Sequence, residues 1–170
     1  MYSFLKNHDV KNFQLKKKIL GHCINEGNFS LADLSKEINI SIPTTTKLIE
    51  ELMEDGFIED MGKQDTNGGR RPSIYGLNPS AGYLVGTEVR RKSISVAVTN
   101  FKGQLIDYYK EVPFVLKNSE ESFRELCRLV TDLIEKIDIS HNHVLAYGFN
   151  LSGRVNNETG YCFTYFIGED

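Results

Sequence analysis

The stretch that decides the fold runs from Phe29 to Ile58: F-S-L-A-D-L-S-K-E-I-N-I-S-I-P-T-T-T-K-L-I-E-E-L-M-E-D-G-F-I. Its apolar spacing predicts two short helices, a glycine stop and the start of a strand. Ser30 and Ser41 stand where the two helices begin, and serine is a preferred N-cap residue. This layout is typical of a winged helix-turn-helix, which places its second helix in the major groove of DNA.

The flanking segments complete that layout. Phe13–Glu26 carries apolar residues at helical spacing and predicts a preceding helix. The expected core side of this helix consists of Leu15, Ile19, Leu20 and Ile24. After the second short helix, Asp60–Arg71 is polar and glycine-rich, as the tip of a β-hairpin wing would be, and Ser73–Leu77 would return as a strand. We therefore expect a DNA-binding domain over residues 1–78, ending where Asn78-Pro79-Ser80 breaks the pattern.

Composition limits the kinds of partner. The chain has 170 residues and a net charge of -3, with 20 Lys and Arg against 23 Asp and Glu. Any contact with DNA must therefore come from locally placed charge and not from the average field. Three widely spaced cysteines, with no secretory signal, predict reduced thiols in a cytoplasmic protein without a metal site. No run approaches about 18 apolar residues, so we expect no membrane span.

The second half, residues 79–170, changes character. Tyr83–Val89, Ser93–Thr99 and Leu105–Val112 are β-rich runs with short links and predict an antiparallel meander. Ser119 would cap an amphipathic helix over Glu120–Ile137, whose expected apolar side consists of Phe123, Leu126, Leu129, Val130, Leu133 and Ile134. Further strands are expected at Val144–Asn150 and Tyr161–Ile167. Three strands, a helix and a fourth strand match the opening of an actin-like, ribonuclease-H-like lobe. The predicted fold class is thus α+β/α/β, a winged helix-turn-helix followed by an incomplete lobe of this ATPase type.

Four motifs, taken in order, resemble the N-terminal part of the ROK-family transcriptional repressors, which are sugar-responsive regulators related to sugar kinases. The motifs are S-I-P-T-T-T-K-L-I-E-E-L-M-E-D-G-F-I, G-G-R-R-P-S, L-N-P-S-A-G-Y-L-V-G and A-Y-G-F-N-L-S-G-R-V-N-N-E-T-G. The resemblance covers the chain from about Lys11 onward. It implies a sequence-specific DNA-binding repressor of carbohydrate metabolism, acting as a homodimer on double-stranded DNA.

The chain departs from the kinase branch of that family in two places. Where the kinases have a glycine-rich phosphate loop, this chain has Gly86-Thr87-Glu88-Val89-Arg90-Arg91-Lys92. The link itself, Arg90-Arg91-Lys92, has no glycine, and a loop without glycine cannot approach phosphates closely. The chain also ends at Asp170, before the family's catalytic Asp, its zinc cluster and most of its sugar contacts. We therefore expect a C-terminally truncated member that is not an enzyme, has no cofactor and responds to a sugar or sugar phosphate only with the missing part.

The candidate DNA contacts form two groups. Ser41, Pro43, Thr44, Thr46 and Lys47 crowd the start of the expected recognition helix, where hydroxyls and an ammonium can reach phosphates or base edges. The alternative is a solvated polar face. Arg70 and Arg71 precede Pro72, and such an element can enter a narrow A/T-rich minor groove. Its alternative is a solvated linker. Lys16, Lys17 and Lys18 either contact the DNA backbone or form a solvated face.

The sequence also allows functions other than repression. Gly153 lies in a loop that resembles the family's sugar-proximal loop, although the family has Pro-Gly where this chain has Ser152-Gly153. A tight turn that needs glycine explains the residue equally well. No spacing predicts a catalytic or metal-binding group. The rival hypotheses are the relic of a sugar kinase and a winged-helix module that binds another protein without catalysis.

Overall fold

The computed structural model describes residues 10–63, 71–137, 139, 143–151, 153–156, 158–159 and 162–163. The chain divides into two compact units, one ending at Ala81 and the other beginning at Gly82. A short 3-10 turn, Pro79–Ala81, stands at the junction and contains part of the segment where the sequence breaks its pattern. Each unit is described by itself.

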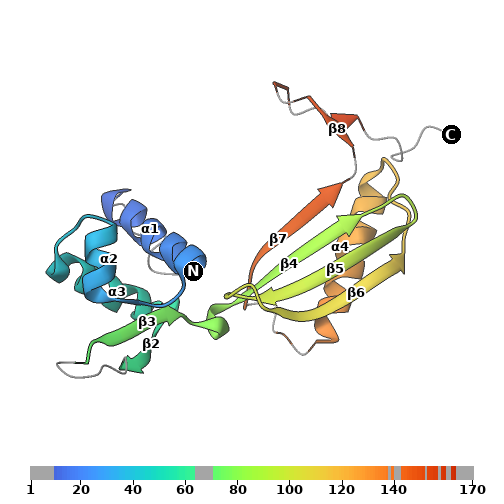
Figure 1. Cartoon of the computed structure of the whole chain (residues 1–170). Helices are drawn as coiled ribbons and strands as arrows, with labels where there is room; N and C mark the ends of the chain where they lie inside the picture. The colour runs from blue at the N-terminus through green and yellow to red at the C-terminus, as the bar shows by residue number, and fades with distance from the viewer. Residues whose placement is uncertain are drawn as a thin grey trace. The chain divides into compact units, whose positions relative to one another are not determined.

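The first unit combines three helices with a small antiparallel sheet (Figure 1). The helices are α1 (Val10–Glu26), α2 (Leu31–Glu37) and α3 (Ile42–Glu54), and the strands are β1 (Phe29–Ser30), β2 (Ile58–Lys63) and β3 (Ser73–Leu77), in the order β1-β3-β2. The three predicted helices and both wing strands are confirmed. The two-residue strand β1 was not predicted, because Phe29 and Ser30 pair with Tyr75 and Ile74 at the far end of the unit's sequence.

The apolar residues of the three helices meet in one core. Its fully buried members include Ile19 of α1, Leu34 of α2, and Leu48, Ile49 and Leu52 of α3. The predicted core side of α1 was wrong at Ile24, which is 66% exposed. The buried residues Lys16, Ile19 and Cys23 recur at i, i+3 and i+7, so the stripe turns away from Ile24.

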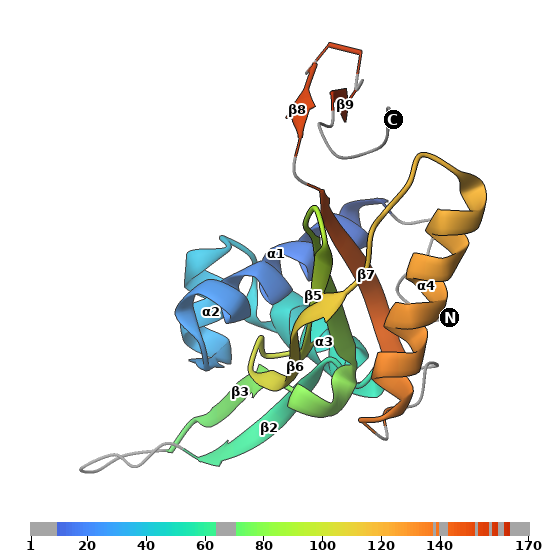
Figure 2. The same ribbon diagram turned by 90° about the vertical axis from the view of Figure 1, so that its right-hand side faces the viewer.

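The second unit is a four-stranded mixed sheet with one helix on one of its faces (Figure 2). Its elements are β4 (Tyr83–Val89), β5 (Ser93–Asn100), β6 (Leu105–Pro113), α4 (Glu120–Glu135) and β7 (Val144–Leu151), and the strand order is β6-β5-β4-β7. The predicted antiparallel meander is confirmed, and β7 then pairs with β4 in parallel. The chain thus crosses from β6 to β7 through α4.

The core of this unit lies between α4 and alternate residues of β4 and β5. Val85 and Val89 of β4 and Ile94, Val96 and Val98 of β5 pack with Leu126, Val130, Leu133 and Ile134 of α4. Phe123 was expected on the core side of the helix but is 52% exposed. It lies one turn before Leu126, beside Phe149 of β7, with ring centroids 6.5 Å apart.

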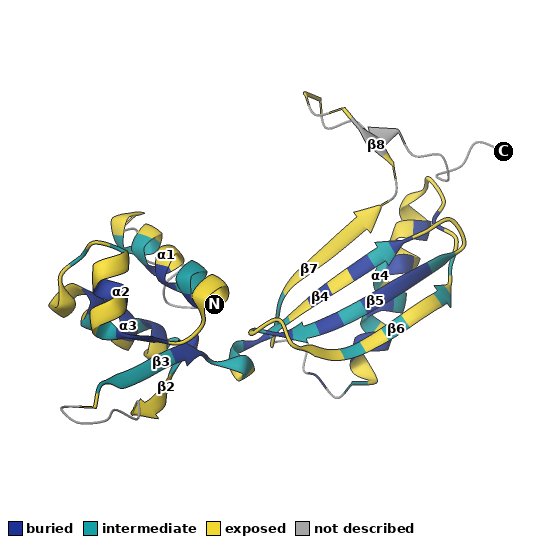
Figure 3. Ribbon diagram, in the orientation of Figure 1, coloured by how far each residue is buried: buried dark blue, intermediate teal, exposed yellow. Residues whose placement is uncertain are grey.

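The two edge strands of this sheet differ in chemistry. The edge strand β6 carries Asp107, Lys110, Glu111 and a terminal Pro113, and its pairing with β5 is interrupted by two register shifts. The edge strand β7 contains no charged residue and no proline, and most of it is exposed (Figure 3). Beyond β7, β8 (Arg154–Val155) pairs with β9 (Cys162–Phe163). The strand predicted over Tyr161–Ile167 is described only at Cys162 and Phe163.

Candidate DNA-binding surface

The start of α3 is fixed by its own first residues. Ser41 is the N-cap, and its Oγ accepts a hydrogen bond from the backbone N–H of Thr44 at 3.4 Å. Pro43 occupies the first turn, where no intrahelical partner for its nitrogen is needed. The polar residues that the sequence predicts for DNA contact are therefore gathered at a well-defined helix start.

The turn between α2 and α3 is also held by local bonds. Ser35 Oγ donates to the carbonyl oxygen of Ile40 at 2.7 Å, and the N–H of Ile40 donates to the carbonyl oxygen of Ser35 at 3.1 Å. Asn39 takes a left-handed conformation with φ of 55°, which asparagine tolerates better than most residues. These contacts set the angle at which α3 leaves the turn.

Five residues of this surface differ in what they can offer a partner. Ser41, Pro43, Thr44 and Lys47 are exposed, and the Lys47 side chain is 75% exposed. Thr46 is half-buried, and its Oγ1 donates to the carbonyl oxygen of Ile42 at 2.9 Å. The structure thus brings the five predicted residues together on the first two turns of α3, with Lys47 as their cation.

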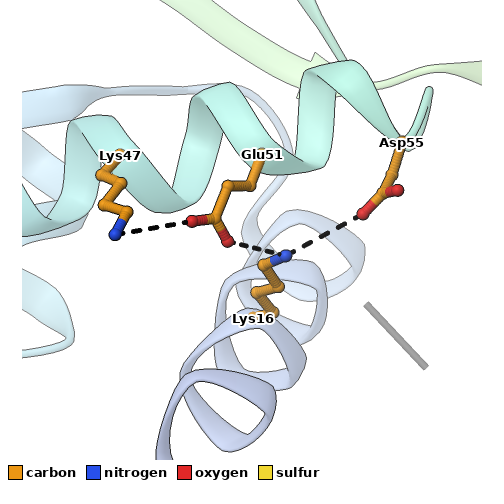
Figure 4. Close-up of polar contacts among 4 residues, drawn as sticks. All are labelled: Lys16, Lys47, Glu51 and Asp55. Atoms are coloured by element: carbon orange, nitrogen blue, oxygen red, sulfur yellow. Dashed lines mark ion pairs between the residues drawn. The ribbon is translucent and has the colours of Figure 1, made fainter. Parts of the chain in front are cut away.

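Thr45 and Lys16 belong to the interior of the domain. Thr45 is fully buried, and its Oγ1 donates to the carbonyl oxygen of Ser41 at 3.1 Å. Lys16 is 2% exposed, and its Nζ lies 2.9 Å from Glu51 Oε2 and 3.9 Å from Asp55 Oδ2 (Figure 4). The sequence predicts either contact with the DNA backbone or a solvated face for the three lysines of α1, and both predictions are wrong for Lys16. This residue instead forms ion pairs between α1 and the C-terminal end of α3. Its neighbours Lys17 and Lys18 are exposed.

The β2–β3 wing lies beside the start of α3. A bulge at Asp60–Gly62 interrupts the pairing of β2 with β3, and the N–H of Gly62 donates to Asp60 Oδ1 at 2.8 Å. A groove of about 730 Å³ runs between this hairpin and the starts of α2 and α3. Its lining is Ser30, Leu31, Ala32, Ile42, Lys63, Arg71, Pro72, Ser73 and Tyr75. Arg71 is therefore brought next to α3, whereas Arg70 lies outside the described residues.

Ion pairs are formed at the turn between β4 and β5, where the sequence predicts no phosphate loop. The Arg90 N–H donates to the carbonyl oxygen of Ser93 at 2.8 Å, closing a tight hairpin between β4 and β5. The Arg90 guanidinium lies 2.9 Å from Glu88 and 3.7 Å from Glu111. The hydrogen bond to Glu88 raises the pKa of Arg90 further above its usual range. Glu88 is thus a partner for Arg90.

Gly153 is exposed in the bend after β7. The carboxyl ends of β4 and β7 lie side by side, since Val89 is in register with Leu151. A loop at adjacent carboxyl ends of parallel strands is a usual place for a ligand in open sheets.

Among the described residues, no three His, Cys, Asp or Glu side chains lie close enough to hold a metal ion. None of the helices in the described part of the chain combines the length and apolar character needed to cross a bilayer.

These features define the first unit as a winged helix-turn-helix. Residues 14–59 match the family model described as winged helix-turn-helix DNA-binding. The class rests on helix α3, its capped start, the preceding short helix and the β2–β3 wing. The sequence had predicted each of these elements.

Comparisons over a longer span are more specific. The chain is 26% identical over 158 residues to the xylose repressor of Caldicellulosiruptor bescii, a match covering 91% of this chain and 39% of that protein. It is 24% identical over 151 residues to the xylose repressor of Bacillus subtilis, covering 88% and 38%. A crystal structure of a ROK family transcriptional regulator, a homologue of the Escherichia coli MLC protein, has the same fold. Its TM-score is 0.60 at 17% identity, covering 93% of this chain and 41% of that one.

The chain is thus similar over nearly its whole length to xylose repressors, and it has the fold of a ROK family transcriptional regulator, the family that its motifs resemble. It spans about two-fifths of the length of the proteins it matches. Both of these relatives are named as xylose repressors.

Proposed function

We propose that this protein is a sequence-specific DNA-binding repressor of carbohydrate metabolism. The observation that carries the proposal is the exposed polar start of α3, inside a winged helix-turn-helix that continues into a lobe like that of the xylose repressors. In this class of domain, the second helix of the motif lies in the major groove and reads base edges near its N-terminus. Ser41, Thr44 and Lys47, which are exposed at the start of α3, are the residues proposed for that role.

The groups divide by the kind of contact that each can make. Lys47 is suited to a phosphate or to a guanine edge, and Thr44 and Thr46 to phosphates or either base type. Pro43 contributes apolar contact at the helix start. Arg70 and Arg71 would enter an adjacent minor groove, where a narrow A/T-rich segment attracts arginine. Arg71 lines the groove beside α3, which supports this placement.

For the second unit we propose the opening part of an actin-like lobe. Its meander, crossover helix and parallel strand follow the order expected of that fold. A sugar or sugar phosphate is the proposed effector, with the loop at Gly153 as one of its contacts. The other contacts would come from a region that corresponds to the part of the longer relatives that this chain does not cover. Phosphorylation of a sugar is not proposed, since Glu88, Arg90 and Glu111 fill the turn where a phosphate loop would be needed.

Repressors of this class act as pairs of DNA-binding heads, so a homodimer in the cytoplasm is the proposed working form. An effector that favours one spacing of the two heads would then change their joint affinity for an operator.

Selection from a library of random duplex DNA at two salt concentrations tests the proposal. Enrichment of a two-part site, with affinity falling steeply as salt rises, is the expected result. Lys47→Ala should weaken binding to the selected duplex, whereas Lys136→Ala, at the end of α4 in the second unit, should not. Weak binding without enrichment would instead favour the protein-interaction module.

A further inference from the structure

One carboxylate on α3 is shared by two lysines that differ greatly in exposure. Glu51 Oε2 lies 2.9 Å from Nζ of Lys16, whose side chain is 2% exposed. Glu51 Oε1 lies 4.0 Å from Nζ of Lys47, whose side chain is 75% exposed. Figure 4 shows the Glu51 carboxylate between the two ammonium groups, with Asp55 on the far side of Lys16. Glu51 therefore connects a buried cation of α1 to the exposed cation of α3.

The formal charges of these four side chains add to zero. Glu51 and Asp55 contribute two negative charges, and Lys16 and Lys47 contribute two positive ones. When Lys47 turns to a DNA phosphate, Lys16 is the cation that remains on Glu51. Without Lys16, an unneutralised carboxylate would both hold Lys47 and repel the approaching phosphate.

We infer that Lys16 is a positioning residue for Lys47 and acts through Glu51, an inference that rests on the proposed DNA-binding function. By pairing with one oxygen of Glu51, Lys16 reduces the hold of that carboxylate on Lys47. The remaining pair between Glu51 and Lys47 is long and exposed, and such pairs are weak. Lys47 is thereby kept along α3 in the free protein and exchanges Glu51 for a phosphate when DNA binds.

A purely structural role for Lys16 makes a different prediction. Buried ion pairs can often be replaced by apolar residues of similar volume without loss of stability. An anchor between α1 and α3 would therefore be satisfied by methionine at residue 16, and the salt dependence of DNA binding would not change. The two roles are separated by the salt slope, which is the slope of the logarithm of DNA affinity against the logarithm of salt concentration. This slope counts the phosphates that the protein neutralises, so it depends on Lys16 only if Lys16 acts on Lys47.

The test uses the full chain and the duplex selected above, with affinity measured by fluorescence anisotropy over a series of salt concentrations. The variants are Lys16→Met, Glu51→Gln, the double variant and Lys47→Ala. Glu54→Gln, an exposed carboxylate in the last turn of the same helix, is the matched control for a simple change of net charge. Circular dichroism and thermal melting establish which variants are folded at the temperature of the binding assay.

Lys47→Ala should reduce the salt slope by about one, the value for one phosphate contact. Lys16→Met should lower affinity roughly tenfold, the size of one lost charge-assisted contact, and move the slope toward that of Lys47→Ala. Glu51→Gln should bind at least as tightly as the natural protein. The double variant should recover both affinity and slope, because the carboxylate that held Lys47 is gone.

A wild-type slope in Lys16→Met, or a double variant no better than Lys16→Met, would overturn the inference while leaving the proposed function intact. If Lys16→Met is unfolded, Glu51→Gln still tests the inference: a Glu51→Gln variant that binds less tightly than Glu54→Gln, or that has a reduced slope, would overturn it. Absence of salt-sensitive binding by the natural protein would instead overturn the proposed function, and the inference with it.

Discussion

Ser41 and Thr45 are joined by two hydrogen bonds to one oxygen. The carbonyl oxygen of Ser41 accepts the backbone N–H of Thr45 at 2.9 Å and its Oγ1 at 3.1 Å. Because Ser41 Oγ also caps the N–H of Thr44, this residue fixes the start of α3 from both its backbone and its side chain. Ser41 therefore belongs to the candidate DNA-binding surface and also stabilises the start of the helix.

Ser41→Ala should lower the free energy of unfolding by about 1 kcal/mol, the usual effect of losing an N-cap. Ser41→Asp should keep the cap, since aspartate is an equally good N-cap and its charge suits a helix N-terminus. The carboxylate would nevertheless repel DNA at the proposed surface. Urea unfolding and DNA titration together check this pair: wild-type DNA affinity in Ser41→Asp would remove Ser41 from the surface.

Thr87 offers the opposite case to Thr45. It is 2% exposed on the same side of β4 as Val85 and Val89, and its Oγ1 has no hydrogen-bond partner among the residues that the structure describes. Thr87→Val should raise the free energy of unfolding by about 1 kcal/mol, since an unsatisfied buried hydroxyl is replaced by a methyl group of the same shape.

The same substitution at Thr45 is the control, because it removes the bond to Ser41 and should destabilise the chain. Thermal melting of the two variants checks the contrast. Equal shifts in one direction would show that the hydroxyl groups are not what distinguishes the two sites.

Lys16→Ala should destabilise the first unit. Removing one partner of a fully buried pair costs roughly 3–5 kcal/mol, and we expect the lower end because Glu51 is 27% exposed and partly screened by water. Adding Glu51→Gln should recover part of this loss. The measurement is a double-mutant cycle by urea unfolding; a coupling energy near zero would contradict a stabilising pair.

Cys23 should be unreactive. Burial raises the pKa of its thiol to about 12, partly offset by a hydrogen bond to the backbone, and the residue is 4% exposed. The thiolate is the nucleophile, so iodoacetamide at pH 8 should label the half-buried Cys127 before Cys23. Peptide mapping by mass spectrometry resolves the two residues. Faster labelling of Cys23 would show that α1 opens readily.

The raised pKa of Cys23 also predicts a pH dependence. Because the folded-state pKa is above the unfolded value, the stability from the protonated thiol is complete below the ordinary thiol pKa of about 8.5. It is lost as the pH rises from there toward 12. The stability of the natural protein relative to Cys23→Ala should therefore fall between pH 8 and pH 10.5. A constant difference over that range would contradict it.

Local signals made most of the fold predictable from the sequence. Serines before α2, α3 and α4 act as caps in the structure, and alternating valines set the inner face of β4 and β5. The failures concern information that sequence periodicity does not contain. Ile24 and Phe123 have the right spacing for a core but no neighbour to cover them fully, and Lys16 is buried because acidic residues of a distant helix compensate its charge.

The candidate site was predictable in part. A capped helix start with hydroxyls and one lysine could be found from the sequence, and the structure places those residues on one surface. The connection from Lys47 through Glu51 to Lys16 could not, because it depends on how α1 crosses α3. Contact of these residues with DNA stays a prediction.

The two edge strands of the sheet in the second unit differ in how readily they can pair with a further strand. Charges and a proline along an edge strand discourage further pairing, and β6 has both, whereas β7 has neither. Tyr147, Phe149 and Leu151 are also exposed on β7. Pairing with a further strand is therefore favoured at β7 and disfavoured at β6. Tyr147→Lys would place a charge on β7 and should reduce association of this chain at high concentration.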